Sequence, residues 1–109
     1  MRRGDLRRAL ALVRRRTHRA PPLAVRLFEK ESCHLCAEAH RALRRVALEM
    51  PLAIERVDIA ALAPDVRDRY ELRIPVLVAG DDELDAAGLE DGAIARWLRE
   101  HGDRSSDPG

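Results

Sequence analysis

Two cysteines, Cys33 and Cys36, are the residues of this chain best suited to chemistry, because they are its only thiols and lie three positions apart. Thiols at this spacing can close a disulfide within one turn of a helix and reopen it by exchange with another thiol. The pair follows an apolar run that is typical of a strand and opens an amphipathic run. We therefore consider a redox-active dithiol first, with a zinc site and a buried structural pair as the alternatives.

A zinc site would need ligands besides the two cysteines. His40 follows them at an acceptable spacing for a third ligand, with His34 or His101 as a remote fourth. A closed structural site usually contains a second ligand pair, and the sequence offers no second cysteine pair. We therefore expect no metal ion here. The structural pair stays open, because Cys36 falls on the apolar face of the run that follows it.

The elements around the dithiol indicate what each thiol does. Leu23–Phe28 alternates in the manner of a strand, and a polar loop follows it. Apolar residues then recur at helical spacing from Cys36 to Met50, and the helix must end before Pro51. This order places Cys33 at a helix N-terminus, where unpaired N–H groups and the helix dipole favour a thiolate.

From this placement we predict different roles for the two thiols. Cys33 would have a depressed pKa and attack the substrate, forming a mixed disulfide. Cys36, one turn inside the helix, would then displace the reduced product. His34 and Lys30 would support the thiolate if they lie close to it.

The remaining elements complete an α/β domain with the order β-α-β-α-β-β-α. The first two strands should be a parallel pair joined by a right-handed crossover, and the last two a hairpin. This order predicts a four-stranded mixed sheet with three helices. The elements predicted after the first helix are Ile54–Ile59, a short helix beginning at Pro64, Ile74–Ala79, Glu83–Ala86 and a final amphipathic helix from Leu89.

Pro75 is the second candidate site residue. A proline at the start of an apolar strand removes a ladder hydrogen bond, so its position needs a reason. Either it simply begins the strand, or it forms a cis bond with Ile74. The cis bond would turn the backbone of Ile74 outward to pair with a substrate strand beside Cys33.

Length and composition fit one small globular domain. The chain has 109 residues, of which 46% are hydrophobic and 36% charged. No apolar run approaches the roughly 20 residues that cross a bilayer, so no membrane is expected among the partners. We place an Arg-rich N-terminal extension at 1–20, the domain at 21–102 and a disordered tail at 103–109.

The extension differs from the domain in charge. It carries eight arginines and Asp5, a net charge of +7, so the rest of the chain sums to −6 within the total of +1. Its apolar part is too short for a secretory signal, so we reject export and expect the reducing cytoplasm. The extension is either solvated or an arm that docks on nucleic acid or anionic lipid. Because it has no aromatic residue to stack on bases, nucleic acid is not the partner we favour.

Four stretches of the chain occur together in one known family. They are the segment from Phe28 to Cys36, then Val57-Asp58-Ile59, Arg69-Tyr70 and Arg73-Ile74-Pro75-Val76-Leu77. In this order they resemble the glutaredoxin-like family of the thioredoxin superfamily, over most of the domain. The resemblance implies a thioredoxin-like fold and a thiol–disulfide oxidoreductase.

The resemblance also implies a role for individual residues. Cys33 matches the nucleophile of the family and Cys36 its resolving cysteine. Pro75 matches the cis-proline, and Ile74 the residue whose backbone contacts bound thiols. Lys30 matches a lysine that helps to hold the glutathione carboxylate in glutaredoxins.

The implied partners are disulfide-containing proteins or small-thiol mixed disulfides. We expect a monomer with no tightly bound cofactor, reduced by glutathione or another low-molecular-weight thiol, and acting in electron transport and cell redox homeostasis. His34-Leu35 stands where glutaredoxins typically carry Pro-Tyr. Two other functions remain as alternatives: a module that binds metal or an iron–sulfur cluster through Cys33 and an external thiol, and a redox-inactive adaptor.

Overall fold

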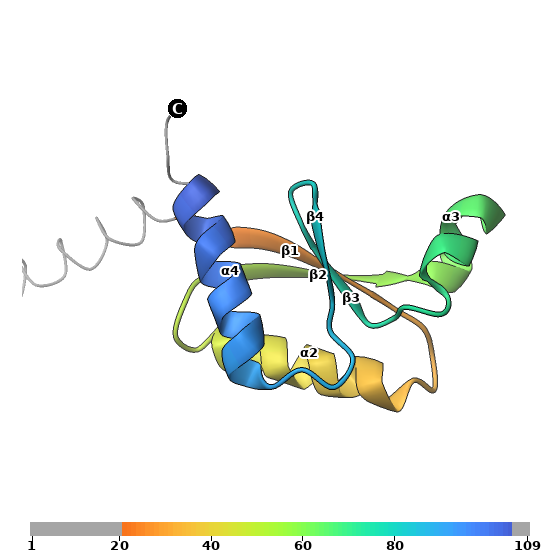
Figure 1. The fold of residues 1–109 in the computed structure, drawn as a ribbon, viewed down its shortest axis with the longest axis horizontal. Coiled ribbons are helices and arrows are strands. Elements are labelled where there is room, and N and C mark those ends of the chain that lie inside the picture. Colours follow the sequence, from red (N-terminus) through yellow and green to blue (C-terminus); the bar gives the residue numbers. More distant parts are fainter. Residues whose placement is uncertain (1–20, 106–109) are drawn as a thin grey trace, which may run out of the picture.

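The computed structural model describes residues 21–105. The predicted Arg-rich extension at 1–20 and the last four residues of the predicted tail lie outside the described residues. The described part forms one sheet with helices on both faces (Figure 1).

The sheet has four strands in the order β2-β1-β3-β4. β1 pairs parallel with β2, whereas β3 pairs antiparallel with β1 and with β4. The predicted four-stranded mixed sheet is therefore confirmed. The strands are β1 (Leu23–Glu29), β2 (Leu52–Asp58), β3 (Val76–Ala79) and β4 (Asp82–Asp85).

Three α-helices pack on this sheet, as predicted. Because side chains alternate along a strand, neighbouring residues contact opposite faces. Leu27 of β1 packs with α2 and α4, while the next residue, Phe28, packs with α3. The helices are α2 (His34–Val46), α3 (Pro64–Tyr70) and α4 (Asp91–Ser105), and a short 3-10 helix, η1 (Ile59–Ala61), precedes α3.

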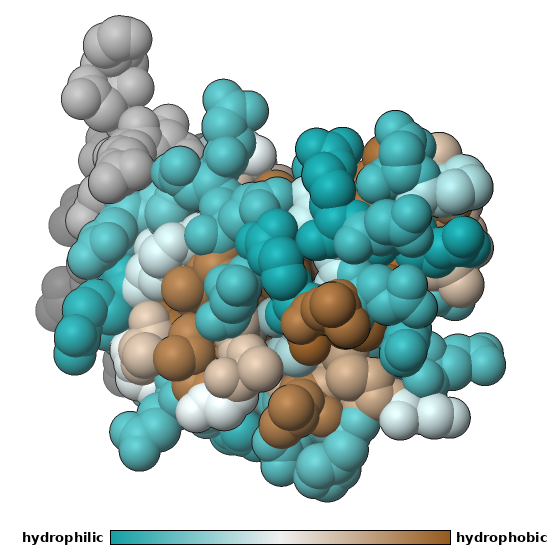
Figure 2. Space-filling model, turned by 45° about the vertical axis from the view of Figure 1, so that its right-hand side comes forward, coloured by the Kyte–Doolittle hydropathy of each residue, from teal (hydrophilic) through white to brown (hydrophobic). Residues whose placement is uncertain are grey.

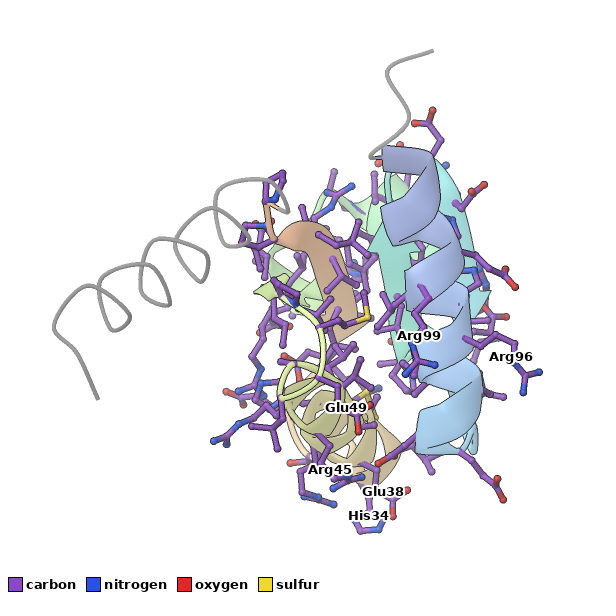
Figure 3. All side chains as sticks on the ribbon, turned by 90° about the vertical axis from the view of Figure 1, so that its left-hand side faces the viewer. His34, Glu38, Arg45, Glu49, Arg96 and Arg99 are labelled. Atoms are coloured by element: carbon purple, nitrogen blue, oxygen red, sulfur yellow. A yellow bond between two sulfur atoms is a disulfide. The ribbon has the colours of Figure 1, made fainter. Side chains whose placement is uncertain are left out.

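The larger cluster of buried side chains lies between the sheet and the α2–α4 layer. It contains the apolar stripe of α2, including Leu43, and Leu98 of α4. An ion pair joins Arg45 of α2 to Asp91 of α4, and a second joins Arg99 of α4 to Glu49 in the turn after α2, with their charged atoms 3.4 Å apart (Figure 3). Burial of this apolar stripe fixes the helix that begins at the dithiol.

The ends of two elements near the dithiol differ from the sequence prediction. α2 ends at Val46 instead of continuing to Met50, because the chain tightens into a turn where Glu49 N–H donates to the Val46 carbonyl. β2 starts two residues earlier than Ile54 and ends before Ile59. Ile59 instead begins η1, because the carboxylate of Asp58 accepts a hydrogen bond from the Ala60 N–H at 2.9 Å.

The second half of the domain also has shifted boundaries. β3 starts at Val76, so Ile74 and Pro75 belong to the loop before it, not to the strand. β4 starts and ends one residue before the predicted Glu83–Ala86. The last helix begins at Asp91 and continues to Ser105, three residues beyond the boundary placed at 102.

Figure 2 shows the apolar surface of one face broken into separate areas by polar side chains. Among the described residues, the large apolar side chains that remain exposed are Leu35, Leu48, Leu72 and Leu89. None of the described helices combines the length and apolar character needed to cross a membrane.

Candidate active site

The dithiol lies at the junction between β1 and α2, as predicted. Cys33 is the N-cap of α2, with an extended backbone, and its Sγ accepts a hydrogen bond from the backbone N–H of Cys36 at 3.2 Å. The two residues form a disulfide, with their Cα atoms 5.2 Å apart. An N-cap side chain normally satisfies one of the unpaired amides of the first helical turn, and here a sulfur atom does so.

The two sulfur-bearing residues differ strongly in burial. Cys36 is 1% exposed and belongs to the apolar stripe of α2, whereas Cys33 is only half-buried. A thiol from another molecule therefore reaches Cys33 more readily than Cys36. This difference in burial is what an exposed attacking thiol and a shielded resolving thiol require.

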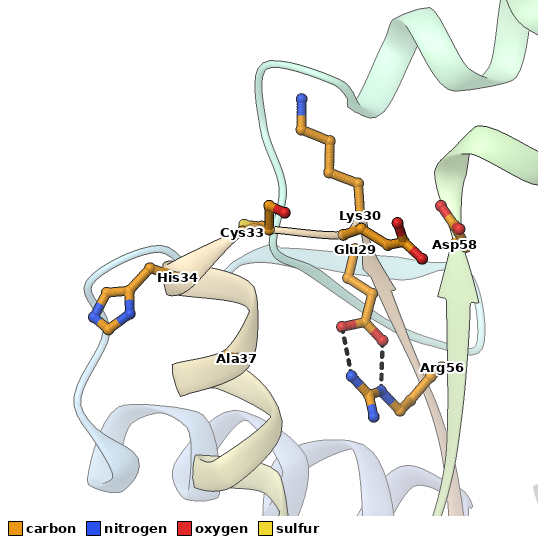
Figure 4. A pocket seen from close by; sticks show the side chains of 9 residues that line it. Glu29, Lys30, Cys33, His34, Ala37, Arg56 and Asp58 are labelled. Carbon is orange, nitrogen blue, oxygen red and sulfur yellow. Dashed lines mark hydrogen bonds and ion pairs between the residues drawn. The ribbon is translucent and has the colours of Figure 1, made fainter.

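A pocket of about 510 Å³ opens beside Cys33 (Figure 4). It is bordered by the end of β1, the dithiol loop, the first turn of α2 and the end of β2. We call it the dithiol pocket. Its lining residues are Glu29, Lys30, Glu31, Ser32, Cys33, His34, Ala37, Arg56 and Asp58.

An ion pair forms one wall of this pocket, and the sequence prediction missed it. Arg56 donates two hydrogen bonds to the carboxylate of Glu29, from Nε at 2.6 Å and from Nη2 at 3.0 Å. The hydrogen bond to Glu29 raises the pKa of Arg56. A signal was present in β1: Val25, Leu27 and Glu29 share the buried side of the strand, so the carboxylate needed a partner.

His40, a residue of the zinc hypothesis, lies near this ion pair on α2. Burial lowers its pKa, and the charges of Arg56 and Arg44 lower it further, whereas Glu29 acts in the opposite direction. The structure finds the His40 side chain half-buried. Among residues 21–105, no group of three or more His, Cys, Asp or Glu side chains comes together as a metal site.

Lys30 and His34, the predicted supports of the thiolate, line the dithiol pocket together with Cys33. Their side chains point in different directions in Figure 4. His34 Nε2 lies 3.1 Å from Glu38 Oε1, one helical turn further along α2. The support of the thiolate by Lys30 and His34 therefore stays a prediction.

Ile74 and Pro75 do not line the dithiol pocket, but the sheet places them at the end of β1 that leads to the dithiol. Val76 pairs with Phe28, so Pro75 comes level with the last residue of β1, just before the dithiol loop. Pro75 is fully buried, and the Ile74–Pro75 peptide bond is cis. The Ile74 N–H donates to the Tyr70 carbonyl at 3.0 Å, so its amide already has a partner within the chain.

Comparison with known protein families gives one match over most of the domain. The model of the "Glutaredoxin-like domain (DUF836)" family matches residues 24–99. The match includes both cysteines and the Ile74–Pro75 pair. Among proteins with curated descriptions, none matches this chain.

Two solved structures share the fold. A structural genomics target protein from X. campestris is 27% identical, with a TM-score of 0.61, and the match covers 70% of this chain and 96% of the other. A glutaredoxin from Archaeoglobus fulgidus is 17% identical, with a TM-score of 0.51, and the match covers 76% of this chain and 94% of that one. The second likeness is evidence of the fold alone.

Proposed function

Because the chain belongs to the glutaredoxin-like domain family, we propose that it is a thiol–disulfide oxidoreductase that reduces protein or low-molecular-weight mixed disulfides. The observation that carries the proposal is the position of the dithiol. Cys33 caps a helix with its sulfur on a backbone N–H, and Cys36 lies buried one turn inside. The same amide that holds the Cys33 sulfur in the disulfide would stabilise a thiolate after reduction.

The proposed reaction transfers two electrons by two exchanges. The Cys33 thiolate attacks one sulfur of the substrate disulfide, forms a mixed disulfide and releases the other substrate sulfur as a thiolate, which takes up a proton. Cys36 then loses its proton and attacks the Cys33 sulfur. This step closes the Cys33–Cys36 disulfide and releases the second substrate thiolate. Two molecules of an external thiol then reduce the Cys33–Cys36 disulfide back to the dithiol and leave as their own disulfide.

Four further residues have proposed roles in holding the substrate. Lys30 and His34 line the dithiol pocket, where they would contact polar groups of the substrate thiol. Ile74 would offer its backbone carbonyl to the substrate, since its amide donates to Tyr70. Pro75 would fix the direction of that carbonyl.

The proposed partners follow from the reaction. They are disulfide-containing proteins and small mixed disulfides, with glutathione or another low-molecular-weight thiol as reductant. We propose that the protein acts as a monomer in the cytoplasm, in electron transfer and cell redox homeostasis, without a tightly bound cofactor.

Single-cysteine variants test the proposal. The purified protein is assayed for reduction of a protein disulfide and of a small mixed disulfide with a thiol reductant. Cys33→Ser is expected to abolish both activities. Cys36→Ser is expected to accumulate a Cys33 mixed disulfide that mass spectrometry detects, because the resolving thiol is gone. Equal activity of the wild type and Cys33→Ser would refute the proposal.

A further inference from the structure

A polar cluster of Arg73, Tyr70 and two carboxylates of β4, Glu83 and Asp85, lies beside the segment that carries Ile74 and Pro75. We propose that Arg73, the residue before Ile74, is a positioning residue that fixes this segment beside the dithiol for the binding of protein disulfides. The inference rests on the proposed function, because it concerns how the substrate chain is gripped. Arg73 would contact neither the reacting sulfurs nor the substrate.

Arg73 bridges two carboxylates of the neighbouring hairpin strand. Its Nη2 donates to Asp85 Oδ1 at 2.8 Å and to Glu83 Oε1 at 2.9 Å, and its Nε donates to Asp85 Oδ1 at 3.2 Å. Glu83 and Asp85 alternate along β4, so they project from the same face of the strand. One guanidinium therefore ties the loop before β3 to two positions of the rigid hairpin.

A second side chain joins this cluster to the strand that leads to the dithiol. The Tyr70 hydroxyl donates to Glu83 Oε2 at 2.5 Å, and the Arg73 guanidinium lies over the Tyr70 ring. The Tyr70 ring packs edge-on against Phe28, with ring centroids 4.5 Å apart. Phe28 is the penultimate residue of β1 and precedes Cys33 by five positions.

Apolar packing holds only the end of the segment, where Ile74 packs against the smaller core cluster and Pro75 is buried. Tyr70 is the last residue of α3, and the next residues, Glu71 and Leu72, are exposed, with Leu72 98% exposed. Ile74 is half-buried, and the segment becomes fully buried only at Pro75. The side chain of Arg73 thus adds a link to β4, beside the backbone hydrogen bonds that Arg73 and Ile74 donate to the Tyr70 carbonyl.

The cluster is suited to fix the position of the Ile74–Pro75 segment more than to stabilise the whole fold. The side chains of Arg73, Glu83 and Asp85 are 37%, 34% and 57% exposed, and ion pairs as exposed as these contribute little to global stability. The core clusters do not include any of the three. A variant that loses the cluster should therefore fold and leave the dithiol chemistry intact.

The test compares Arg73→Ala with Arg99→Ala, which removes an exposed ion pair to Glu49 on the α2–α4 side of the domain. Steady-state reduction is measured with a protein disulfide and with a small mixed disulfide, and the Cys33–Cys36 reduction potential is measured against a glutathione buffer. For Arg73→Ala, we expect the KM for the protein disulfide to rise roughly three- to tenfold, the loss expected for misplaced hydrogen-bonding groups. The kcat, the KM for the small disulfide and the reduction potential should match those of Arg99→Ala.

Two further variants separate positioning from folding. Arg73→Lys keeps one charge contact but lacks the planar fork that bridges two carboxylates. Its KM for the protein disulfide should therefore rise less than that of Arg73→Ala. Glu83→Gln combined with Asp85→Asn removes both negative charges that face Arg73 and should raise the same KM that Arg73→Ala raises.

The outcomes distinguish this inference from the proposed function. No turnover by the wild type would overturn both. Turnover by the wild type with an unchanged protein KM in Arg73→Ala, or an equal rise for the small disulfide, would overturn the positioning role alone. If Arg73→Ala does not fold, the double variant decides in the same way, and a shared failure to fold would make Arg73 a stability residue and overturn the inference.

Discussion

The Sγ of Cys33 lies 3.2 Å from the backbone nitrogen of Cys36, with Cys33 as the N-cap of α2 and Cys36 in its first turn. The outer residue accepts a hydrogen bond from the helix end, and the inner one is shielded by the apolar core. This relationship makes the two thiols chemically unequal once the disulfide is reduced.

The first prediction is therefore selective alkylation of the reduced protein. Cys33 should react with iodoacetamide well before Cys36 at neutral pH, because it combines access with a donor to its thiolate. Peptide mapping by mass spectrometry measures the ratio of the two products. In urea both thiols should react at similar rates. Similar rates in the folded protein as well would contradict the predicted inequality.

The second prediction uses Tyr70, the only tyrosine of the chain. Its hydrogen bond to Glu83 is the main cause that raises the pKa of the phenol, and burial adds to it. The ultraviolet absorbance of the phenolate should thus appear only above the ordinary tyrosine pKa of about 10. In Glu83→Gln the midpoint should move down toward that value. An unshifted wild-type midpoint would rule out the hydrogen bond in solution.

The same shift gives a pH dependence of stability. A folded state that keeps the phenol proton while the unfolded state loses it becomes less stable as the pH rises through about 10. Urea unfolding on both sides of this pH should show the loss in the wild type. Tyr70→Phe, which cannot ionise, should lack this part of the pH dependence.

The third prediction concerns the wall of the dithiol pocket. Arg56→Ala leaves the buried Glu29 carboxylate without its guanidinium, and we expect the free energy of unfolding to fall by about 1–3 kcal/mol. Arg45→Ala is the matched control, because Arg45 also pairs with a carboxylate, that of Asp91, but both partners are exposed. Denaturant unfolding compares the two, and an equal loss would show that burial of Glu29 is not what makes its pair important.

The fourth prediction compares one substitution at two leucines. Leu43 is fully buried between the sheet and α4, so Leu43→Ala should lower the free energy of unfolding by about 2–5 kcal/mol. Leu72 is exposed, and Leu72→Ala should change it by less than about 0.5 kcal/mol. Thermal or urea unfolding gives both values. A large loss in Leu72→Ala would mean that this side chain is covered in solution.

Local patterns predicted the elements whose side chains follow a strict period. The apolar stripe of α2 is continuous, and β3 is short and wholly buried, so their type and order were clear from the sequence. The family resemblance, carried by the dithiol and the later Ile74–Pro75 pair, was confirmed by the family match. Cys33 and Cys36 could be placed because the order of strand and helix around them is local.

Features that depend on strand pairing could not be read in the same way. The Glu29–Arg56 pair requires β1 and β2 to lie in a register that sets Leu27 opposite Arg56. Likewise, Arg73 reaches Glu83 and Asp85 only because the β3–β4 hairpin aligns them. Neither register is encoded by the local period of a single strand, since many pairings bury the same face.

The position of β4 at the edge of the sheet has a consequence for solubility. An edge strand offers unpaired backbone groups to any other extended chain. A chain that paired with β4 in an aggregate would lie beside the side chains of β4. On β4 those side chains are mostly carboxylates, Asp82, Glu83 and Asp85. A second copy of this strand would bring like charges together and would have to remove water from them. The residues that hold Arg73 therefore also discourage the sheet from growing into a fibril.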